Sequence, residues 1–98
     1  MSNQFGNKVK ELRVKNNLFQ KHLANALNID TPLYSKIERG ERKAKKEYIP
    51  ILAKILKTSI DELTTVWLAD QVLDVLKDEK LANKALKEVS NNIKQLKK

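Results

Sequence analysis

The chain has 98 residues and a formal net charge of +8, which is enough for one domain and too little for a second independent core. It has no cysteine and a single histidine, which excludes disulfides and leaves too few ligands for a metal site. Only two glycines and two prolines are present, and the many Leu, Lys, Ala, Asn and Glu residues favour helices, so we expect an all-α protein. No leader-like start and no apolar run of the ~20 residues that a membrane span needs is found, so we expect a cytoplasmic protein without membrane contact.

The positive charge is confined to the first part of the chain. Residues 1–60 contain 13 Lys and Arg against 5 Asp and Glu, whereas residues 61–98 contain 7 of each kind. A basic segment next to a neutral one indicates that the first contacts a polyanion and that the second has another task. The alternative is a lysine-rich surface that serves only solubility.

Two helices are predicted before residue 28, over about residues 3–16 and residues 20–27. Their apolar side chains recur at three- and four-residue steps. The inward positions are Phe5, Val9, Leu12 and the further candidate Val14 in the first helix, and Leu23, Ala24 and Leu27 in the second. Asn28 follows where a left-handed residue would reverse the chain.

A third helix is predicted over about residues 31–38. Asp30 suits its N-cap, and Pro32 falls in the first turn, where a missing N–H costs no helical hydrogen bond. Gly40 ends the helix as a left-handed residue would. A helical wheel places Tyr34 and Ile37 on the core side and Pro32, Ser35, Lys36 and Arg39 on the opposite side. That side either faces water or enters a major groove, and the pattern alone fits both.

Three further helices are predicted. Residues 41–46 carry four cations and form either a solvated loop or a phosphate contact. A fourth helix begins at residue 46 or 47, ends at residue 56 and has its inward positions at Ile49, Leu52, Ala53 and Leu56. Ser59 and Glu62 match the capping box of a fifth helix over residues 60–77. A sixth, over residues 82–96, has apolar residues at steps of four and three, the seam of a helix that packs along another helix.

Residues 5–63 resemble the Cro and phage-repressor type of helix-turn-helix protein, the XRE family. The residues that carry the resemblance are Leu12, Arg13, Leu18, Gln20, Leu23, Ala24, Leu27, Ile29, residues 35–40, Leu52, Ala53 and residues 61–63. The resemblance implies a five-helix lambda-repressor-like DNA-binding domain, which we place at residues 1–63, followed by a C-terminal helical extension for dimerisation at residues 64–98. In that family the second helix crosses the DNA backbone and the third lies in the major groove.

The resemblance and the charge pattern together predict the DNA contacts. The expected base-reading residues are Thr31, Pro32, Ser35 and Lys36. The expected phosphate-binding residues are Gln20, Lys21, Arg39, Arg42, Lys43 and Lys45. Arg13 and Glu38 match a pair that in phage repressors joins the first helix to the end of the third, so we expect them to hold the recognition helix in place.

The sequence departs from the family pattern at two positions. Phe19 replaces the threonine that usually caps the second helix, which puts the start of that helix in doubt. Asn28 replaces the usual turn glycine, a milder change because asparagine tolerates the left-handed region. His22 lies near the expected backbone contact, but an ordinary surface histidine is the favoured interpretation.

The C-terminal extension exposes too much apolar surface for a free helical hairpin. It either folds back on the first domain or pairs with a second chain, and we favour the dimer because specific affinity normally needs two recognition helices. The expected interface residues are Trp67, Leu68, Val72, Val75, Leu76, Leu86, Val89 and Ile93.

The predicted function is a homodimeric, sequence-specific transcriptional regulator on a pseudo-palindromic DNA operator. Phage-type repressors and restriction–modification controllers both fit, and the sequence does not separate them. The alternative is an antitoxin whose C-terminal helices bind a toxin while its first domain represses the shared promoter. We expect no enzymatic activity, because the chain lacks a Gly-rich phosphate loop and a catalytic cluster. We also expect no metal, no cofactor and no small-molecule effector.

Overall fold

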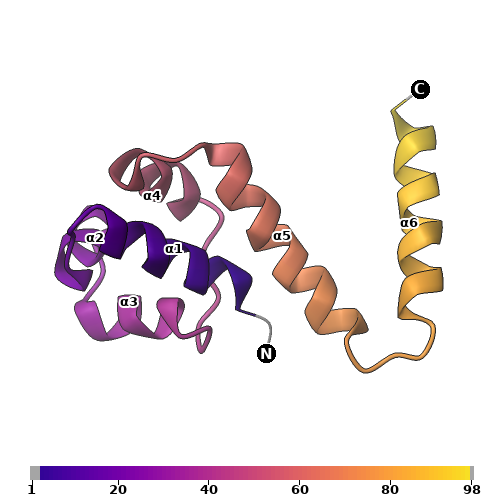
Figure 1. Cartoon of the computed structure of the whole chain (residues 1–98), viewed down its shortest axis with the longest axis horizontal. Coiled ribbons are helices and arrows are strands. Elements are labelled where there is room, and N and C mark those ends of the chain that lie inside the picture. Colours follow the sequence, from indigo (N-terminus) through magenta and orange to yellow (C-terminus); the bar gives the residue numbers. More distant parts are fainter. Residues whose placement is uncertain (1–2, 98) are drawn as a thin grey trace.

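The computed structural model describes residues 3–97, which form six helices and no strand (Figure 1). The helices are α1 (Gln4–Lys15), α2 (Gln20–Leu27), α3 (Thr31–Glu38), α4 (Tyr48–Leu56), α5 (Ile60–Leu76) and α6 (Ala82–Leu96). The all-α prediction is therefore confirmed. The first four helices and the beginning of α5 surround the core, and the rest of α5 and α6 extend away from it.

The core contains the inward positions that the periodicity predicts, with one exception. Its buried apolar residues are Phe5, Val9, Leu23, Ala24, Leu27, Tyr34, Ile37, Ala44, Ile49, Leu52, Ala53, Leu56 and Leu63. Leu12 packs against this cluster and is partly buried. Val14, in contrast, is 58% exposed, because five positions rotate it about 140° around α1 from the buried Val9. The expectation of an inward Val14 is therefore wrong.

Left-handed residues follow four of the helices in the described part of the chain. They are Asn17, Asn28, Gly40 and Lys57, with φ between 57° and 77°. Each allows the next residue's N–H to bond to a carbonyl five residues back, as from Glu41 to Lys36 at 2.9 Å, so the last helical carbonyls are satisfied. Asn28 and Gly40 have the conformation that the sequence predicts, whereas a left-handed lysine is unexpected because its Cβ makes that region costly.

Carboxylate or hydroxyl side chains cap three of the helix starts. Asp30 Oδ1 accepts the Leu33 N–H at 2.8 Å, and Ser59 Oγ accepts the Glu62 N–H at 3.0 Å. Both caps were predicted, and they fix where α3 and α5 begin. The third capped start belongs to α1, and its cap is formed by a residue of α5.

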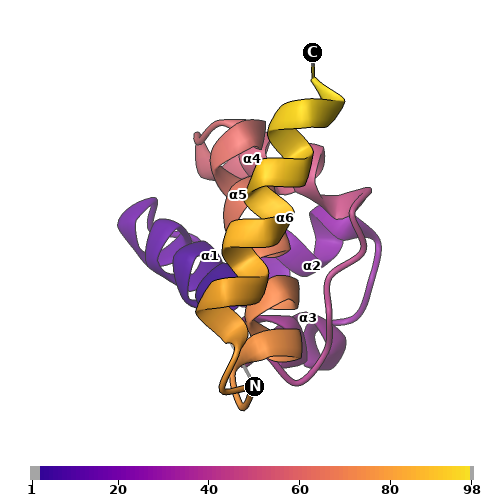
Figure 2. The same ribbon diagram turned by 90° about the vertical axis from the view of Figure 1, so that its right-hand side faces the viewer.

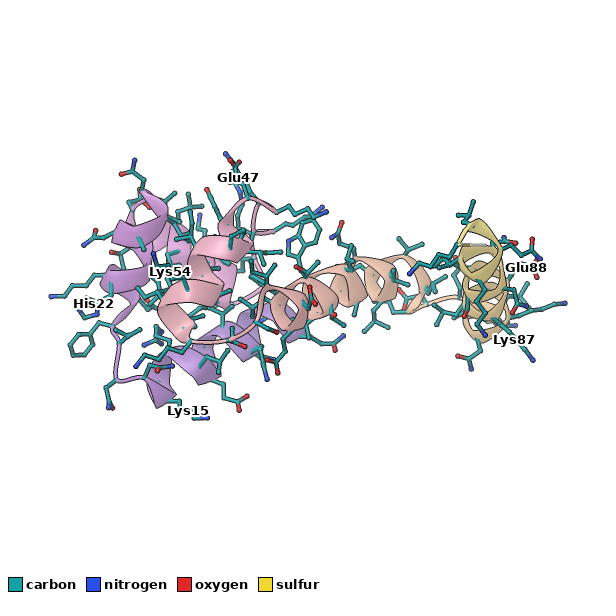
Figure 3. The ribbon with its side chains drawn as sticks, turned by 90° about the horizontal axis from the view of Figure 1, so that it is seen from above. Lys15, His22, Glu47, Lys54, Lys87 and Glu88 are labelled. Atoms are coloured by element: carbon teal, nitrogen blue, oxygen red, sulfur yellow. The ribbon has the colours of Figure 1, made fainter. Side chains whose placement is uncertain are left out.

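The start of α2 shows how the chain accommodates Phe19. The Phe19 side chain forms no cap hydrogen bond, yet α2 begins at Gln20 as predicted. His22 Nδ1 accepts the Phe19 N–H at 2.9 Å, and the two rings stack with centroids 5.6 Å apart. His22 lies on the outer surface, as expected (Figure 3), and its imidazole supplies part of the missing cap.

α5 ties the extension to the first helix. The Asp70 carboxylate accepts the N–H groups of Gln4 at 2.9 Å and Phe5 at 2.8 Å, from a position 65 or 66 residues away in sequence. Val66 and Trp67 also pack against the core cluster. α5 continues without a break past residue 63, where we expect the domain boundary, so residues 64–71 of the extension pack with the compact part of the structure.

α6 stands apart from the rest of the molecule. It joins α5 through the turn at residues 77–81 and then diverges from it (Figure 1), so that α6 lies in front of the other helices in the turned view of Figure 2. Over its span Ala82–Leu96 no residue is buried. Within residues 3–97, no helix has both the length and the apolar character of a membrane span.

Candidate nucleic-acid interface

α3 presents one face to the core and the opposite face outward. Tyr34 is fully buried and Ile37 is 3% exposed, so these two side chains anchor the helix. Pro32, Lys36 and Arg39 are exposed on the other side. The turn at Asn28 and the cap at Asp30 orient the helix in this way, and the helical-wheel prediction of its two faces is confirmed.

A buried carboxylate holds α3 against the two preceding helices. Glu38 is 3% exposed and forms a bidentate ion pair with Arg13, with Nε–Oε2 at 2.7 Å and Nη2–Oε1 at 3.2 Å. It also accepts the Tyr34 hydroxyl at 2.6 Å and the Gln20 amide at 3.1 Å. Arg13 Nη1 donates further to the Leu18 carbonyl at 3.0 Å. One carboxylate therefore connects α1, α2 and α3.

The ionisation of this network follows from its hydrogen bonds. Burial alone would raise the pKa of Glu38, but the hydrogen bonds from Arg13, Tyr34 and Gln20 outweigh burial, and the pKa lies below its usual value. The hydrogen bond to Glu38 raises the pKa of Arg13. Burial, reinforced by the bond to Glu38, raises the pKa of Tyr34. At neutral pH the network is thus a charged pair with a neutral phenol.

α1 and α3 cross in very close contact near the end of α3. Asn3 Nδ2 donates to the Glu38 carbonyl oxygen at 2.9 Å, which satisfies one of the last carbonyls of the recognition helix. A Cβ at Gly6 would overlap that same oxygen and lie 2.8 Å from the Ile37 carbonyl oxygen. Only glycine fits at this crossing, and no local sequence pattern around Gly6 indicates this requirement.

The expected base-reading residues lie on one face of α3. Pro32 and Lys36 are exposed, and Thr31 and Ser35 are half-buried. Ser35 Oγ accepts a hydrogen bond from Arg39 Nη1, and Arg39 also forms an ion pair with Glu41. Each of these two exposed residues changes the pKa of the other. The hydrogen bond and charge of Glu41 raise the pKa of Arg39, and those of Arg39 lower the pKa of Glu41. Arg39 must release or share Glu41 in order to contact phosphate.

The expected phosphate-binding residues do not all share this surface. Lys21 and Lys45 are exposed, and each ammonium lies about 6 Å from an aromatic ring, at 5.9 Å from the Phe19 ring and 6.0 Å from the Tyr48 ring. Gln20 instead donates its amide to Glu38. Its place at the start of α2 is the predicted one, but the structure gives it a role inside the network.

The loop after α3 is held by α5. The Trp67 indole N–H donates to the Ala44 carbonyl at 2.8 Å. The Lys43 ammonium donates to Gln71 Oε1 at 2.7 Å and lies 5.0 Å from the Trp67 ring. The Lys43 side chain is thus directed at α5. Arg42 is exposed and follows α3, and its backbone N–H donates to the Lys36 carbonyl at 3.3 Å. Trp67, which we expected at an interface, is partly buried in the fold.

The arrangement defines a helix-turn-helix DNA-binding protein: α2 and α3 meet at a tight turn, and α3 offers an exposed polar face with cations beside it. Within residues 3–97, no group of three or more His, Cys, Asp or Glu side chains could hold a metal ion.

The comparison with protein families agrees with this helix-turn-helix assignment. A family model described as Helix-turn-helix matches residues 9–63, more than half of the chain. The chain belongs to this family, the XRE type of helix-turn-helix protein, whose members are DNA-binding transcription regulators and typically not enzymes. No curated protein and no solved structure was found to match the chain. The match ends at residue 63, so residues 64–76 of α5 and all of α6 lie outside it.

Proposed function

We propose that the protein is a homodimeric, sequence-specific transcriptional regulator that places α3 in the major groove at each half of a pseudo-palindromic operator. The observation that supports this assignment best is the outward face of α3, which the Glu38 network holds in a fixed orientation. Fixed orientation matters because base contacts discriminate only when donors and acceptors are positioned accurately.

In this proposal Lys36 and Pro32 are the main base-reading residues. Lys36 can donate to guanine O6 or N7, and Pro32 can contact a thymine methyl group. Thr31 and Ser35 lie beside them with hydroxyl groups that donate or accept. Exposed Arg42, Lys45 and Lys21 supply the phosphate contacts, and Arg39 joins them once it leaves Glu41.

The dimer is supported by the exposed apolar side chains of α5 and α6. Leu68, Val72, Val75, Leu86, Val89 and Ile93 are each between 43% and 73% exposed. Surface of this kind marks an interaction site. These six residues and Leu76 form the proposed interface, whereas Trp67 contributes to the fold beneath it.

The alternative is an antitoxin in which the same exposed surface of α5 and α6 binds a toxin. The observation in its favour is that α6 buries no residue in the single chain, as expected of a segment that awaits a partner. The two functions can be distinguished with the purified protein alone, by whether this surface is buried or accessible. A homodimer buries this surface without a second protein, whereas an antitoxin leaves it accessible until the toxin is added.

A salt titration of DNA binding tests the proposal. Affinity for an operator selected from random DNA is measured at several salt concentrations for the unaltered chain and for Lys36→Ala, Arg42→Ala and Lys84→Ala. The slope of log K against log salt is negative, and loss of one phosphate contact makes it less steep by about 0.9, which is the expectation for Arg42→Ala. Lys36→Ala should lower the affinity for the selected operator more than the affinity for unrelated DNA. Lys84 is an exposed residue of α6, and its replacement should change neither quantity.

The proposal fails in its base-reading part if Lys36→Ala weakens all sequences equally. It fails altogether if the unaltered chain shows no salt-dependent affinity for duplex DNA. A slope for Lys84→Ala that becomes less steep by as much as that of Arg42→Ala would show that charge alone, and not the surface around α3, determines binding.

A further inference from the structure

α5 exposes a broader apolar surface than one neighbouring helix covers. Beyond its contacts with the core, Leu68, Val72, Leu73 and Val75 are each more than 40% exposed. Together with Leu76 they occupy a sector of about 160° around the helix, at 100° per residue. A helix that is apolar over such a wide sector is normally buried between several neighbours.

α6 offers a single narrower stripe. Its apolar residues Ala82, Leu86, Val89, Ile93 and Leu96 follow steps of four, three, four and three, which place them within about 80° of one another. Lys87 and Glu88 point away from this stripe and from α5 (Figure 3). A 15-residue helix that buries nothing is marginal in water, so α6 needs a partner for its stripe.

The two surfaces face each other across an open groove. Val72, Val75 and Leu76 line one wall, and Leu86, Val89 and Ile93 line the other. In the single chain the two helices diverge from the turn at residues 77–81 (Figure 1), and the groove lies between them. Its lining is mostly apolar, with Ser90, Lys94 and Lys97 as the polar members, so an apolar surface suits it as occupant.

A second copy of this chain fits the groove better than closure within one chain. If α6 folded back onto its own α5, an 80° stripe would cover only part of a 160° sector, and Leu73 or Leu68 would remain exposed. Two copies supply two α5 and two α6 helices, which is enough to cover both sectors. Residues 61–98 have equal numbers of acids and bases, so two copies can meet here without the repulsion that the basic first part would cause.

We propose that two copies exchange α6, so that the α6 stripe of each chain packs against the Val72 face of the other chain's α5. The two α5 helices pack on each other through the remaining part of their apolar sectors, and the result is a four-helix bundle. This inference rests on the homodimer proposed above and adds its architecture. The exchange fixes the two copies of α3 relative to each other, because α5 is tied to α1 by Asp70 and to the loop after α3 by Trp67.

Disulfide trapping between different chains tests the exchange, and the absence of cysteine from the chain makes the background zero. A tagged Val72→Cys chain and an untagged Val89→Cys chain are refolded together and oxidised, and the products are separated by size without reductant. The expected product is a mixed disulfide of one tagged and one untagged chain. Leu68→Cys with Ile93→Cys repeats the test about one turn away, in case one pair impairs folding. Asn91→Cys, on the opposite side of α6, replaces Val89→Cys as the control and should give little mixed product.

The double variant Val72→Cys/Val89→Cys shows whether the contact lies within one chain. In the exchanged dimer it should form a covalent dimer. A disulfide closed within a single chain, or no disulfide for either pair, would overturn the exchange, and so would an Asn91→Cys control that reacts equally well. Sedimentation of the unaltered chain separates the two proposals. If it is a dimer while the disulfide closes within one chain, only the exchange is wrong, whereas a monomer would also contradict the proposed homodimer.

Discussion

The carboxylate of Asp70, in the middle of α5, accepts the backbone N–H of Phe5, in the first turn of α1, at 2.8 Å. Its other oxygen accepts the Gln4 N–H at 2.9 Å. A negative charge at this position satisfies two N–H groups that have no partner within the helix and also interacts favourably with the positive end of the α1 dipole. By capping the start of α1, Asp70 thus joins α5, the helix proposed for dimerisation, to the first helix of the DNA-binding domain.

Replacement of Asp70 should destabilise the DNA-binding domain. We expect Asp70→Ala to lower the free energy of unfolding by about 1–2 kcal/mol and Asp70→Asn to have a smaller effect, because the amide still offers one acceptor. Thermal or urea unfolding followed by circular dichroism measures both. Asp78→Ala removes the same charge from the exposed turn after α5 and should change stability by less than about 0.5 kcal/mol. Equal losses for Asp70→Ala and Asp78→Ala would contradict the capping role.

The Glu38 network should make stability depend on pH in a defined direction. The pKa of Glu38 is lowered in the folded state from its ordinary value of 4.5, so the folded state binds this proton less well than the unfolded state. The stabilisation is therefore complete above about pH 4.5 and is lost as the pH falls through the lower folded-state pKa. Urea unfolding between pH 7 and pH 3 should show this loss of stability. The variant Glu38→Gln has no titrating carboxylate at this position, so it should not show the part of the loss that comes from Glu38.

Removal of the Glu38 carboxylate should be costly at neutral pH. Glu38→Ala leaves Arg13, Tyr34 and Gln20 without their shared acceptor and should cost about 3–5 kcal/mol. Glu38→Gln keeps the shape and one acceptor and should cost less, about 1–3 kcal/mol. A melting curve for Glu38→Ala that matches that of the unaltered chain would refute the importance of the network.

Gly6 should be irreplaceable by alanine. The added methyl group would overlap the Glu38 carbonyl oxygen and press on the Ile37 carbonyl oxygen, and neither backbone atom can move without shifting α3. We expect Gly6→Ala to cost more than about 1 kcal/mol, although alanine has the higher helix propensity. A gain in stability, which propensity alone predicts, would show that the α1–α3 crossing is looser than described.

Lys57 offers a prediction of the opposite sign. Its φ of 57° is unfavourable for a residue with a Cβ, so Lys57→Gly should stabilise the protein by about 0.5–1 kcal/mol. Lys54→Gly, the same replacement inside α4, should destabilise it by about 0.5–1 kcal/mol. Chemical denaturation of the two variants compares them directly, and a loss of stability in both would disprove the strain at Lys57.

The sequence predicted the helices and the orientation of α3 because these depend on local signals. Periodicity, the Asp30 and Ser59 caps and the left-handed Asn28 and Gly40 act within a few residues, and the structure contains each of them. Long-range contacts could not be predicted in this way. Nothing near Asp70 indicates that its partners are the N–H groups at the start of α1, because those groups are brought to it only by the packing of α1 against α5.

Two side chains show where a pattern loses information. Periodicity treats Trp67 as one more apolar position, but its indole N–H needs an acceptor when buried and finds it at the Ala44 carbonyl. Lys43 counts as one more cation near α3, but the direction of its ammonium is set by Gln71 and the Trp67 ring. Hydropathy identified the helical segments, whereas the orientation of the Trp67 and Lys43 side chains depends on long-range contacts between α5 and the loop after α3.

Selection of binding sites from random duplex DNA, followed by footprinting of the enriched sequences, tests most directly whether a dimer presents two copies of α3 to the major groove. We expect two similar half-sites related by two-fold symmetry, with centres one helical turn or a multiple of it apart, about 10–10.5 base pairs per turn. Lys36→Ala should change the preferred base at the same position in both half-sites. Enrichment of no sequence, or of a single half-site without a symmetric counterpart, would contradict a dimer that presents two copies of α3 to the major groove.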